Sequence, residues 1–209
     1  MNKQPEELEE LVEIARSLFQ RGYSFGTAGN ISVRINDVVY ATPTGSSFGT
    51  LTAGALAPCD LDGRPASSQK PTKEILFHTA CYRARPESRA VVHLHSTYAT
   101  AVATLRDLDE QNALPALTPY FAMRVPSLPT VPYLPPGDPG LATEVERLAA
   151  GTPAMLMRNH GSIAIGKTLR EAAALAEEVE ETARLYLLLG ERGQPLTSTQ
   201  VAELRRRFS

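Results

Sequence analysis

The sequence predicts an α/β fold in which helices cover a mixed β-sheet. Apolar residues recur at helical spacing in two long segments, over residues 8–19 and 169–189. Between these segments, short apolar runs bounded by turn residues are typical of strands. Because the 209-residue chain contains no evident repeat or linker, we expect one domain over residues 1–209.

Two predicted helices are clearly amphipathic. The first is bounded by Pro5 and Gly22, and its apolar face is formed by Leu8, Leu11, Val12, Ala15, Leu18 and Phe19. The second covers residues 169–189, and its apolar side carries Ala172, Leu175, Ala176, Val179, Ala183, Tyr186 and Leu187. Each helix therefore has one face suited to packing on a sheet.

The predicted strands are short and lie between the two helices. Residues 31–35 and 38–42 form a pair joined by a two-residue turn, and an apolar strand covers residues 90–95. A second pair of strands flanks residues 159–161. The order of these strands in the sheet does not follow from the sequence.

Further helices and one irregular region complete the prediction. A helix is expected from Thr72, as its N-cap, to about residue 85, with Pro86 ending the segment. A shorter helix follows over residues 98–105. Residues 115–140 are rich in proline, which predicts irregular structure or edge strands.

The composition excludes several classes of function. A net charge of −2 provides no basic surface for nucleic acid. Two cysteines, Cys59 and Cys81, are too few for a disulfide scaffold and lack metal-finger spacing. Residues 1–5 lead straight into acidic residues without a signal-peptide core, and no apolar run could span a membrane. We therefore expect a cytoplasmic protein.

Three of the four histidines follow apolar runs. His93 and His95 close the strand over residues 90–95, and alternate residues of a strand share a face, so both imidazoles can reach one point. His160 follows a second apolar run, within an Asn-His-Gly turn. The alternative for an isolated His-x-His pair is an ordinary polar strand end. The third histidine favours a catalytic site for zinc or another transition metal.

Other polar groups allow two interpretations each. Glu74 lies in the first turn of a predicted helix, where it either interacts with the helix dipole or acts as a general acid/base. For His78, one turn further, a packing or hydrogen-bonding role is favoured. Clusters at residues 26–30, at 44–47 and at Thr72 and Lys73 suit either phosphate binding or simple turns.

Taken together, these motifs resemble those of the class II aldolase/adducin family, in order from about residue 8 to residue 190. They are Gly26–Ser32, Thr42–Gly45, the Glu74 helix, His93–Ser96 and Asn159–Gly161. Within the family, the sequence is most similar to the 3-oxo-tetronate 4-phosphate decarboxylases. The supporting segments are residues 19–23, 70–74, 93–97, 117–120 and 131–133.

The resemblance implies a fold, an assembly and a site. The fold is a three-layer α/β/α sandwich with a central, largely antiparallel sheet, and the assembly is a homotetramer. A Zn²⁺ ion, or another divalent transition metal such as Mn²⁺ or Co²⁺, would bind the residues His93, His95 and His160. Glu74 would be the catalytic acid/base. The substrate phosphate would be surrounded by Asn30, Thr44, Gly45, Thr72 and Lys73.

The resemblance also implies a reaction. This is the metal-dependent decarboxylation of 3-oxo-tetronate 4-phosphate to dihydroxyacetone phosphate and CO₂ through an enediolate, in the catabolism of four-carbon acid sugars. Lys73 replaces the serine usual in the sugar-phosphate aldolases, which favours this subgroup over an aldolase or 4-epimerase. A non-catalytic, adducin-like assembly domain would not need the metal triad.

Two further residue groups keep alternative interpretations. Tyr120 matches a tyrosine that the family can deliver from a neighbouring subunit as a proton donor, although an aromatic packed at an interface is equally compatible. The basic tail over residues 204–209 either caps a subunit interface or is a solvated helix end, and we favour the second.

Overall fold

The computed structural model describes residues 5–208 and contains a mixed sheet within this range. The strands are β1 (Asn30–Ile35), β2 (Val38–Ala41), β3 (Ala57–Cys59), β4 (Ala90–Leu94), β5 (Thr130–Val131), β6 (Ala154–Met157) and β7 (Gly161–Gly166). Their order is β3-β2-β1-β4-β7-β6-β5, and every adjacent pair is antiparallel except β5 and β6. The predicted, largely antiparallel sheet is thus confirmed.

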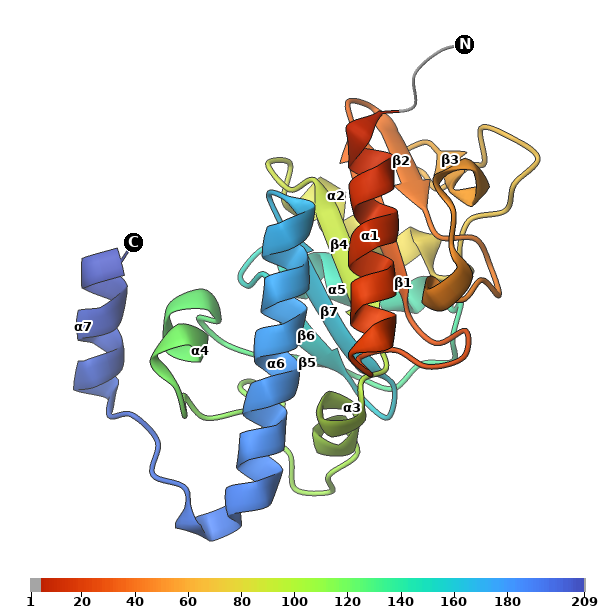
Figure 1. Ribbon diagram of the computed structural model, residues 1–209. Helices are drawn as coiled ribbons and strands as arrows, with labels where there is room; N and C mark the ends of the chain where they lie inside the picture. Colours follow the sequence, from red (N-terminus) through yellow and green to blue (C-terminus); the bar gives the residue numbers. More distant parts are fainter. Residues whose placement is uncertain (1–4, 209) are drawn as a thin grey trace.

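Helices cover both faces of this sheet (Figure 1). The α-helices of the described range are α1 (Glu6–Gln20), α2 (Ile75–Ala84), α3 (Thr97–Ala103), α4 (Pro119–Arg124), α5 (Pro139–Ala149), α6 (Leu169–Leu189) and α7 (Ser198–Phe208). In the view of Figure 1, α1 and α6 lie in front of the sheet, and α2 and α5 lie behind it. The three-layer α/β/α prediction is therefore confirmed. None of the helices in the described range combines the length and apolar character that crossing a membrane requires.

The alternation of side chains along β4 divides the core between the two layers. Val92 and Leu94 pack in the cluster that contains the apolar faces of α1 and α6. Val91 belongs to the cluster with α2 and α5, and the ring of His93 contacts Phe77 of α2 edge-on. Because side chains alternate along a strand, His93 points toward the α2 layer.

Several elements within residues 115–149 differ from the prediction. Helix α4 and helix α5 were not expected, although each begins with a proline directly after a capping residue, Thr118 or Asp138. Proline lacks an amide hydrogen, and at the first position of a helix that hydrogen would have no partner. High proline content was therefore mistaken for irregularity there. The edge-strand alternative is correct for β5, which ends the sheet.

Two other differences concern short or displaced elements. Strand β3 was not predicted, because it has only three residues and contains Pro58. Helix α2 begins at Ile75 rather than near Thr72, and Glu74 occupies the N-cap position. The Thr72 amide donates to the carbonyl of Thr42, which holds this segment extended against the loop after β2 until the helix can begin.

The C-terminal helix α7 lies beside α4, away from the sheet (Figure 1). Arg205 donates to the carbonyls of Ala122 and Pro126, each at 3.0 Å, where α4 ends. Arg206 and Arg207 are exposed in this chain, and the solvated helix end favoured over an interface cap stays a prediction. Residues 1–4, which the signal-peptide prediction includes, lie outside the described range, as does Ser209 of the basic tail.

Candidate active site

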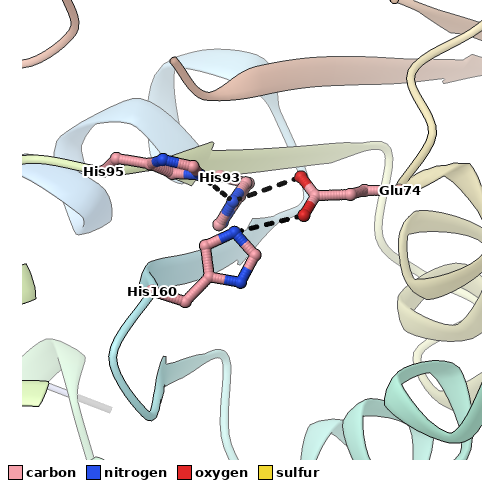
Figure 2. Close-up of side chains that lie close together, drawn as sticks. All are labelled: Glu74, His93, His95 and His160. Carbon is pink, nitrogen blue, oxygen red and sulfur yellow. Dashed lines mark hydrogen bonds and ion pairs between the residues drawn. The ribbon is translucent and has the colours of Figure 1, made fainter. Parts of the chain in front are cut away.

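Three histidines and one glutamate meet at one edge of the sheet (Figure 2). The ligand atoms of Glu74, His93, His95 and His160 all lie within 4.8 Å of one another. His93 and His95 come from the end of β4, His160 from the turn between β6 and β7, and Glu74 from the N-cap of α2. The predicted convergence of the three histidines is therefore observed.

The pairing of β4 with β7 brings these segments together. Leu94 lies opposite Ser162 in the antiparallel register, so the next residue on each strand, His95 and Gly161, falls at the same edge. A Cβ atom at residue 161 would lie 2.1 Å from the carbonyl oxygen of Leu94, so only glycine fits this close approach. Asn159 adopts a φ of 57°, which asparagine tolerates better than most residues. The Asn-His-Gly sequence thus forms the turn that presents His160.

The donor geometry fits a divalent cation. His93 Nδ1 donates to the carbonyl of Ser162 at 2.9 Å, which leaves the Nε2 lone pair directed into the cluster. His95 Nε2 lies 2.8 Å from His93 Nε2. The Glu74 oxygens lie 3.3 Å from His93 Nε2 and 3.2 Å from His160 Nε2. Three imidazole nitrogens facing a carboxylate are a donor set that transition metals bind.

Burial favours the neutral form of His93 and His95, which is the form that binds a metal. Burial lowers the pKa of His93 and, with the neighbouring histidines, lowers the pKa of His95 to about 3. Burial by itself would raise the pKa of Glu74, but His93 and hydrogen bonds from His160 and Asn30 hold that pKa below its usual range. Glu74 is therefore held as a carboxylate beside the imidazoles of His93 and His160.

A cavity of about 280 Å³ opens beside Glu74 and His95. Its lining includes all of the residues predicted to surround a phosphate: Asn30, Thr44, Gly45, Thr72 and Lys73. Two loops form this wall, because Thr44 N–H donates to the carbonyl of Lys70 and Thr44 Oγ1 donates to the carbonyl of Pro71, at 3.2 and 2.7 Å. The predicted set thus shares one wall of one cavity.

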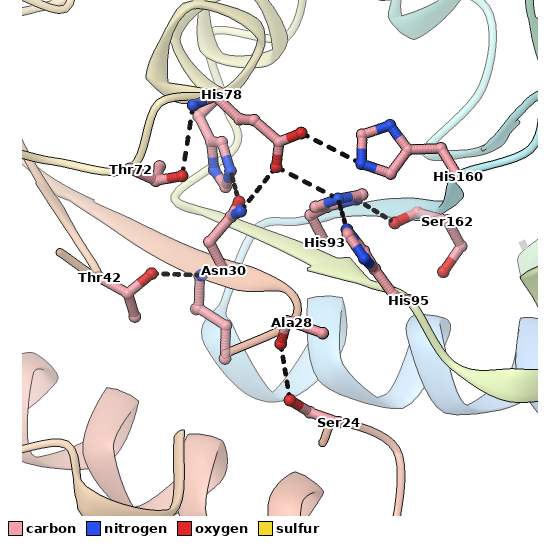
Figure 3. Close-up of polar contacts among 12 residues, drawn as sticks. Ser24, Ala28, Asn30, Thr42, Thr72, His78, His93, His95, His160 and Ser162 are labelled. Atoms are coloured by element: carbon pink, nitrogen blue, oxygen red, sulfur yellow. Dashed lines mark hydrogen bonds and ion pairs between the residues drawn. The ribbon is translucent and has the colours of Figure 1, made fainter. Parts of the chain in front are cut away.

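The loop before β1 approaches the cluster closely. Gly29 has a φ of 81°, and a Cβ atom there would lie 2.8 Å from the carbonyl oxygen of His93. Ser24 Oγ donates to the carbonyl of Ala28 at 2.7 Å and ties the loop together (Figure 3). The loop places Asn30, the first residue of β1, where its amide Nδ2 donates to Glu74 Oε2 at 2.8 Å. Glycine is therefore required at residue 29 of the motif by this close approach.

Tyr120 is not among the residues that line the cavity. It lies on α4, where 61% of its surface is exposed. A role for Tyr120 as a proton donor stays a prediction, and it would require the residue to reach the site of a neighbouring subunit.

One structural residue of the site was missed by sequence reasoning. Glu180 lies within α6 and is buried, with 6% of its surface exposed. It accepts hydrogen bonds from Ser96 Oγ at 2.7 Å and from the amides of Tyr98 and Ala99 at 2.9 and 2.7 Å. These donors directly follow His95, so Glu180 fixes the turn from β4 into α3. In the sequence it stands among other glutamates and looks like part of a solvated face.

Replacing Glu180 with alanine is expected to lower the free energy of unfolding by about 3 kcal/mol, because buried donors would lose their acceptor. Glu181→Ala is the matched control: its carboxylate is half exposed and contacts Arg184 at 3.6 Å. The control is expected to change stability by less than about 1 kcal/mol. Urea unfolding of both variants checks this, and equal losses would contradict the capping role.

The fold and the site together define a class of protein. The model of the class II aldolase and adducin N-terminal domain family matches residues 9–187. The chain belongs to this family.

The particular relatives are similar over nearly their whole length. The 3-oxo-tetronate 4-phosphate decarboxylase of Escherichia coli K12 is 48% identical over 199 residues, covering 94% of each chain. The enzyme of the same name from Haemophilus influenzae is 45% identical, covering 94% of this chain and 95% of its own. The crystal structure of YgbL from Escherichia coli superposes with a TM-score of 0.92 at 46% identity, covering 95% of this chain and 97% of that one.

Proposed function

We propose that this chain catalyses the metal-dependent decarboxylation of 3-oxo-tetronate 4-phosphate to dihydroxyacetone phosphate and CO₂, in the catabolism of four-carbon acid sugars. The observation that carries the proposal is the group of Glu74, His93, His95 and His160, two of them buried and two half-buried, beside a cavity in a chain 48% identical to an enzyme of that name. We further propose that the enzyme acts in the cytoplasm as a homotetramer, with residues 1–209 as one domain.

His93, His95 and His160 would hold the metal, as Zn²⁺ or as another divalent ion such as Mn²⁺ or Co²⁺. When bound, such an ion supplies Lewis-acid stabilisation of negative charge that develops on the substrate oxygens. The hydrogen bond from His93 Nδ1–H to the Ser162 carbonyl would persist during the reaction and keep the imidazole in the tautomer that binds the metal through Nε2.

The wall of the cavity would bind the substrate phosphate. Thr44, Gly45 and Thr72 lie in two loops that are hydrogen-bonded to one another, and Asn30 lines the same cavity. Lys73 is exposed on the same wall and supplies a cation for the dianion. With the phosphate held there, the reacting end of a four-carbon substrate would extend toward Glu74 and His95.

The reaction breaks one carbon–carbon bond and moves one proton. The carboxylate lies β to the C3 ketone, so the electron pair of the C1–C2 bond passes to the ketone oxygen as CO₂ leaves. The remaining enediolate must take up a proton at C2 to give dihydroxyacetone phosphate. Glu74 would mediate this proton return at its carboxylate, or Tyr120 of a neighbouring subunit would do so.

Replacing Lys73 with serine is expected to raise the KM for the phosphorylated substrate about tenfold or more, because a charge-assisted hydrogen bond is lost. The value of kcat should change much less. Lys70→Ser is the control, since Lys70 is exposed three residues away and its side chain does not line the cavity. Steady-state kinetics of the two variants provide the test, and an unchanged KM in Lys73→Ser would remove this residue from the phosphate site.

The deciding experiment measures CO₂ and dihydroxyacetone phosphate from 3-oxo-tetronate 4-phosphate, with and without a chelator. We expect equal amounts of both products and the loss of both with chelator. The D- and L-configured acids are assayed separately.

A sugar-phosphate aldolase or 4-epimerase is the second candidate. It is favoured by a relative named L-fuculose phosphate aldolase from Methanococcus maripaludis, which is 35% identical over 88% of this chain and 97% of its own. Retro-aldol cleavage of a ketose phosphate leaves the same enediolate, so the same residues serve either reaction. Release of an aldehyde from a ketose phosphate, without release of CO₂ from 3-oxo-tetronate 4-phosphate, would identify the protein as an aldolase.

A further inference from the structure

A line of buried polar residues leads away from Glu74 into the α2 layer. Glu74, His78 and Tyr82 are spaced four residues apart, so they lie along one side of α2. Asn30 and Ser32 are alternate residues of β1 and share a face. Four residues of a helix rise about 6 Å and two residues of a strand rise about 6.6 Å, so the two rows stay in step.

The two rows join into one series of hydrogen bonds, and Figure 3 shows the part of it that runs from His78 through Asn30 to the Glu74 carboxylate. Tyr82 OH lies 2.8 Å from Ser32 Oγ, and Ser32 Oγ lies 2.8 Å from His78 Nδ1. His78 Nε2 then lies 2.5 Å from Asn30 Oδ1, and Asn30 Nδ2 donates to Glu74 Oε2 at 2.8 Å. All five residues are buried.

The carboxylate at one end determines the direction of every bond. Glu74 only accepts, so Asn30 must present its amide Nδ2 to it and its Oδ1 to His78. His78 must then carry its proton on Nε2. Burial lowers the pKa of His78 to about 3, so the ring is neutral and Nδ1 accepts.

The rest of the chain follows from the tautomer of His78. Ser32 uses its only hydrogen to donate to Nδ1, and Tyr82 donates to Ser32. Each donor therefore points along the chain toward Glu74, an arrangement in which the bonds polarise one another.

We propose that His78 is a positioning residue that holds the carboxamide of Asn30 with its N–H toward Glu74. The proposal rests on the proposed function insofar as Glu74 is the acid/base. Ser32 and Tyr82 act one step further away, by keeping the proton of His78 on Nε2. Without the His78 donor, the carboxamide is free to turn, and its oxygen would then face the carboxylate. Two acceptors in contact repel, so Glu74 would leave the orientation in which Oε1 faces His160.

The kinetic test compares two replacements of His78. His78→Leu keeps the volume but removes the donor, and it is expected to lower kcat about 10- to 100-fold, as for other residues that orient catalytic groups. His78→Gln retains an amide donor near the position of Nε2 and should recover most of that loss. Metal content should be unchanged in both, because the three metal-binding histidines remain.

Thr79→Val is the matched control for these variants. Thr79 is the next residue of α2 and is buried. Its hydroxyl donates to the carbonyl of Leu76 and takes no part in the hydrogen bonds that run from Tyr82 to Glu74. Its replacement should lower stability without lowering kcat. Equal losses of kcat in His78→Leu and His78→Gln at full metal loading would overturn the proposal.

A second measurement does not depend on activity. Two-bond ¹H–¹⁵N correlation spectra of the wild-type protein at pH 7 report the tautomer of each histidine, and His78→Gln identifies the His78 signals. We expect a neutral ring with the proton on Nε2 that does not titrate between about pH 5 and 8. A proton on Nδ1 would overturn the proposal. If the wild type released no CO₂, the proposed function would fail, and the tautomer would still decide whether this chain of bonds exists.

Discussion

Replacing His95 with alanine is expected to remove the bound metal and to lower decarboxylation at least about 1,000-fold. A Lewis acid supplies several kcal/mol of charge stabilisation, and each 1.4 kcal/mol is a factor of about ten in rate. His95 contributes one of the three nitrogens and lies 2.8 Å from His93 Nε2, so its loss leaves two imidazoles and an open side toward the cavity. Metal content after dialysis and the rate of CO₂ release are measured together.

Thr97→Ala is the control for this variant. Thr97 is exposed two residues after His95 and belongs neither to the cluster nor to the cavity wall. It is expected to retain wild-type metal content and activity. Wild-type turnover by metal-free His95→Ala protein would exclude the metal from the reaction.

Replacing Glu74 with glutamine is expected to lower kcat about 10²- to 10⁴-fold, the usual contribution of a general acid/base. Glutamine has nearly the same shape, so the cavity should persist. His93, His95 and His160 remain, so the protein is expected to retain metal. The loss should therefore appear in kcat at full metal loading, and this separates the prediction from that for His95.

The control for Glu74 is Glu87→Gln. Glu87 lies beyond the other end of α2, where its exposed carboxylate contacts Arg85 at 3.3 Å. We expect unchanged kcat for this variant. Near wild-type kcat in Glu74→Gln would mean that a group other than Glu74 returns the proton, and Tyr120 would be the first residue to test.

Much of the site could be predicted because its residues occupy positions that local patterns define. Strand periodicity places His93 and His95 on one face, and an Asn-His-Gly turn after an apolar run places His160 at a strand end. That all three reach one point follows from the pairing of β4 with β7, which the sequence left open. The roles proposed for these residues remain predictions until the variants are measured.

Local sequence patterns were less informative where one residue type is common in two different kinds of structure. Proline at residues 119 and 139 begins a helix, yet the same residue type is typical of irregular segments. Strand β3 is too short for any periodicity to be visible. Thr72 is a residue type that often caps a helix, but its amide donates to the carbonyl of Thr42 in the loop after β2. The helix therefore begins later, at Ile75.

The sequence by itself determined the layered α/β architecture, the amphipathic helices and the three histidines at strand ends, because these depend on periodicity within single segments. Only the tertiary structure decided the strand order, the burial of Glu180 beneath the turn after His95, and the line from Tyr82 to Glu74. Each of these joins residues distant in the chain. The burial of a polar side chain cannot be predicted from residue spacing. It depends on a hydrogen-bond partner that is distant in the sequence and is brought close only by tertiary packing.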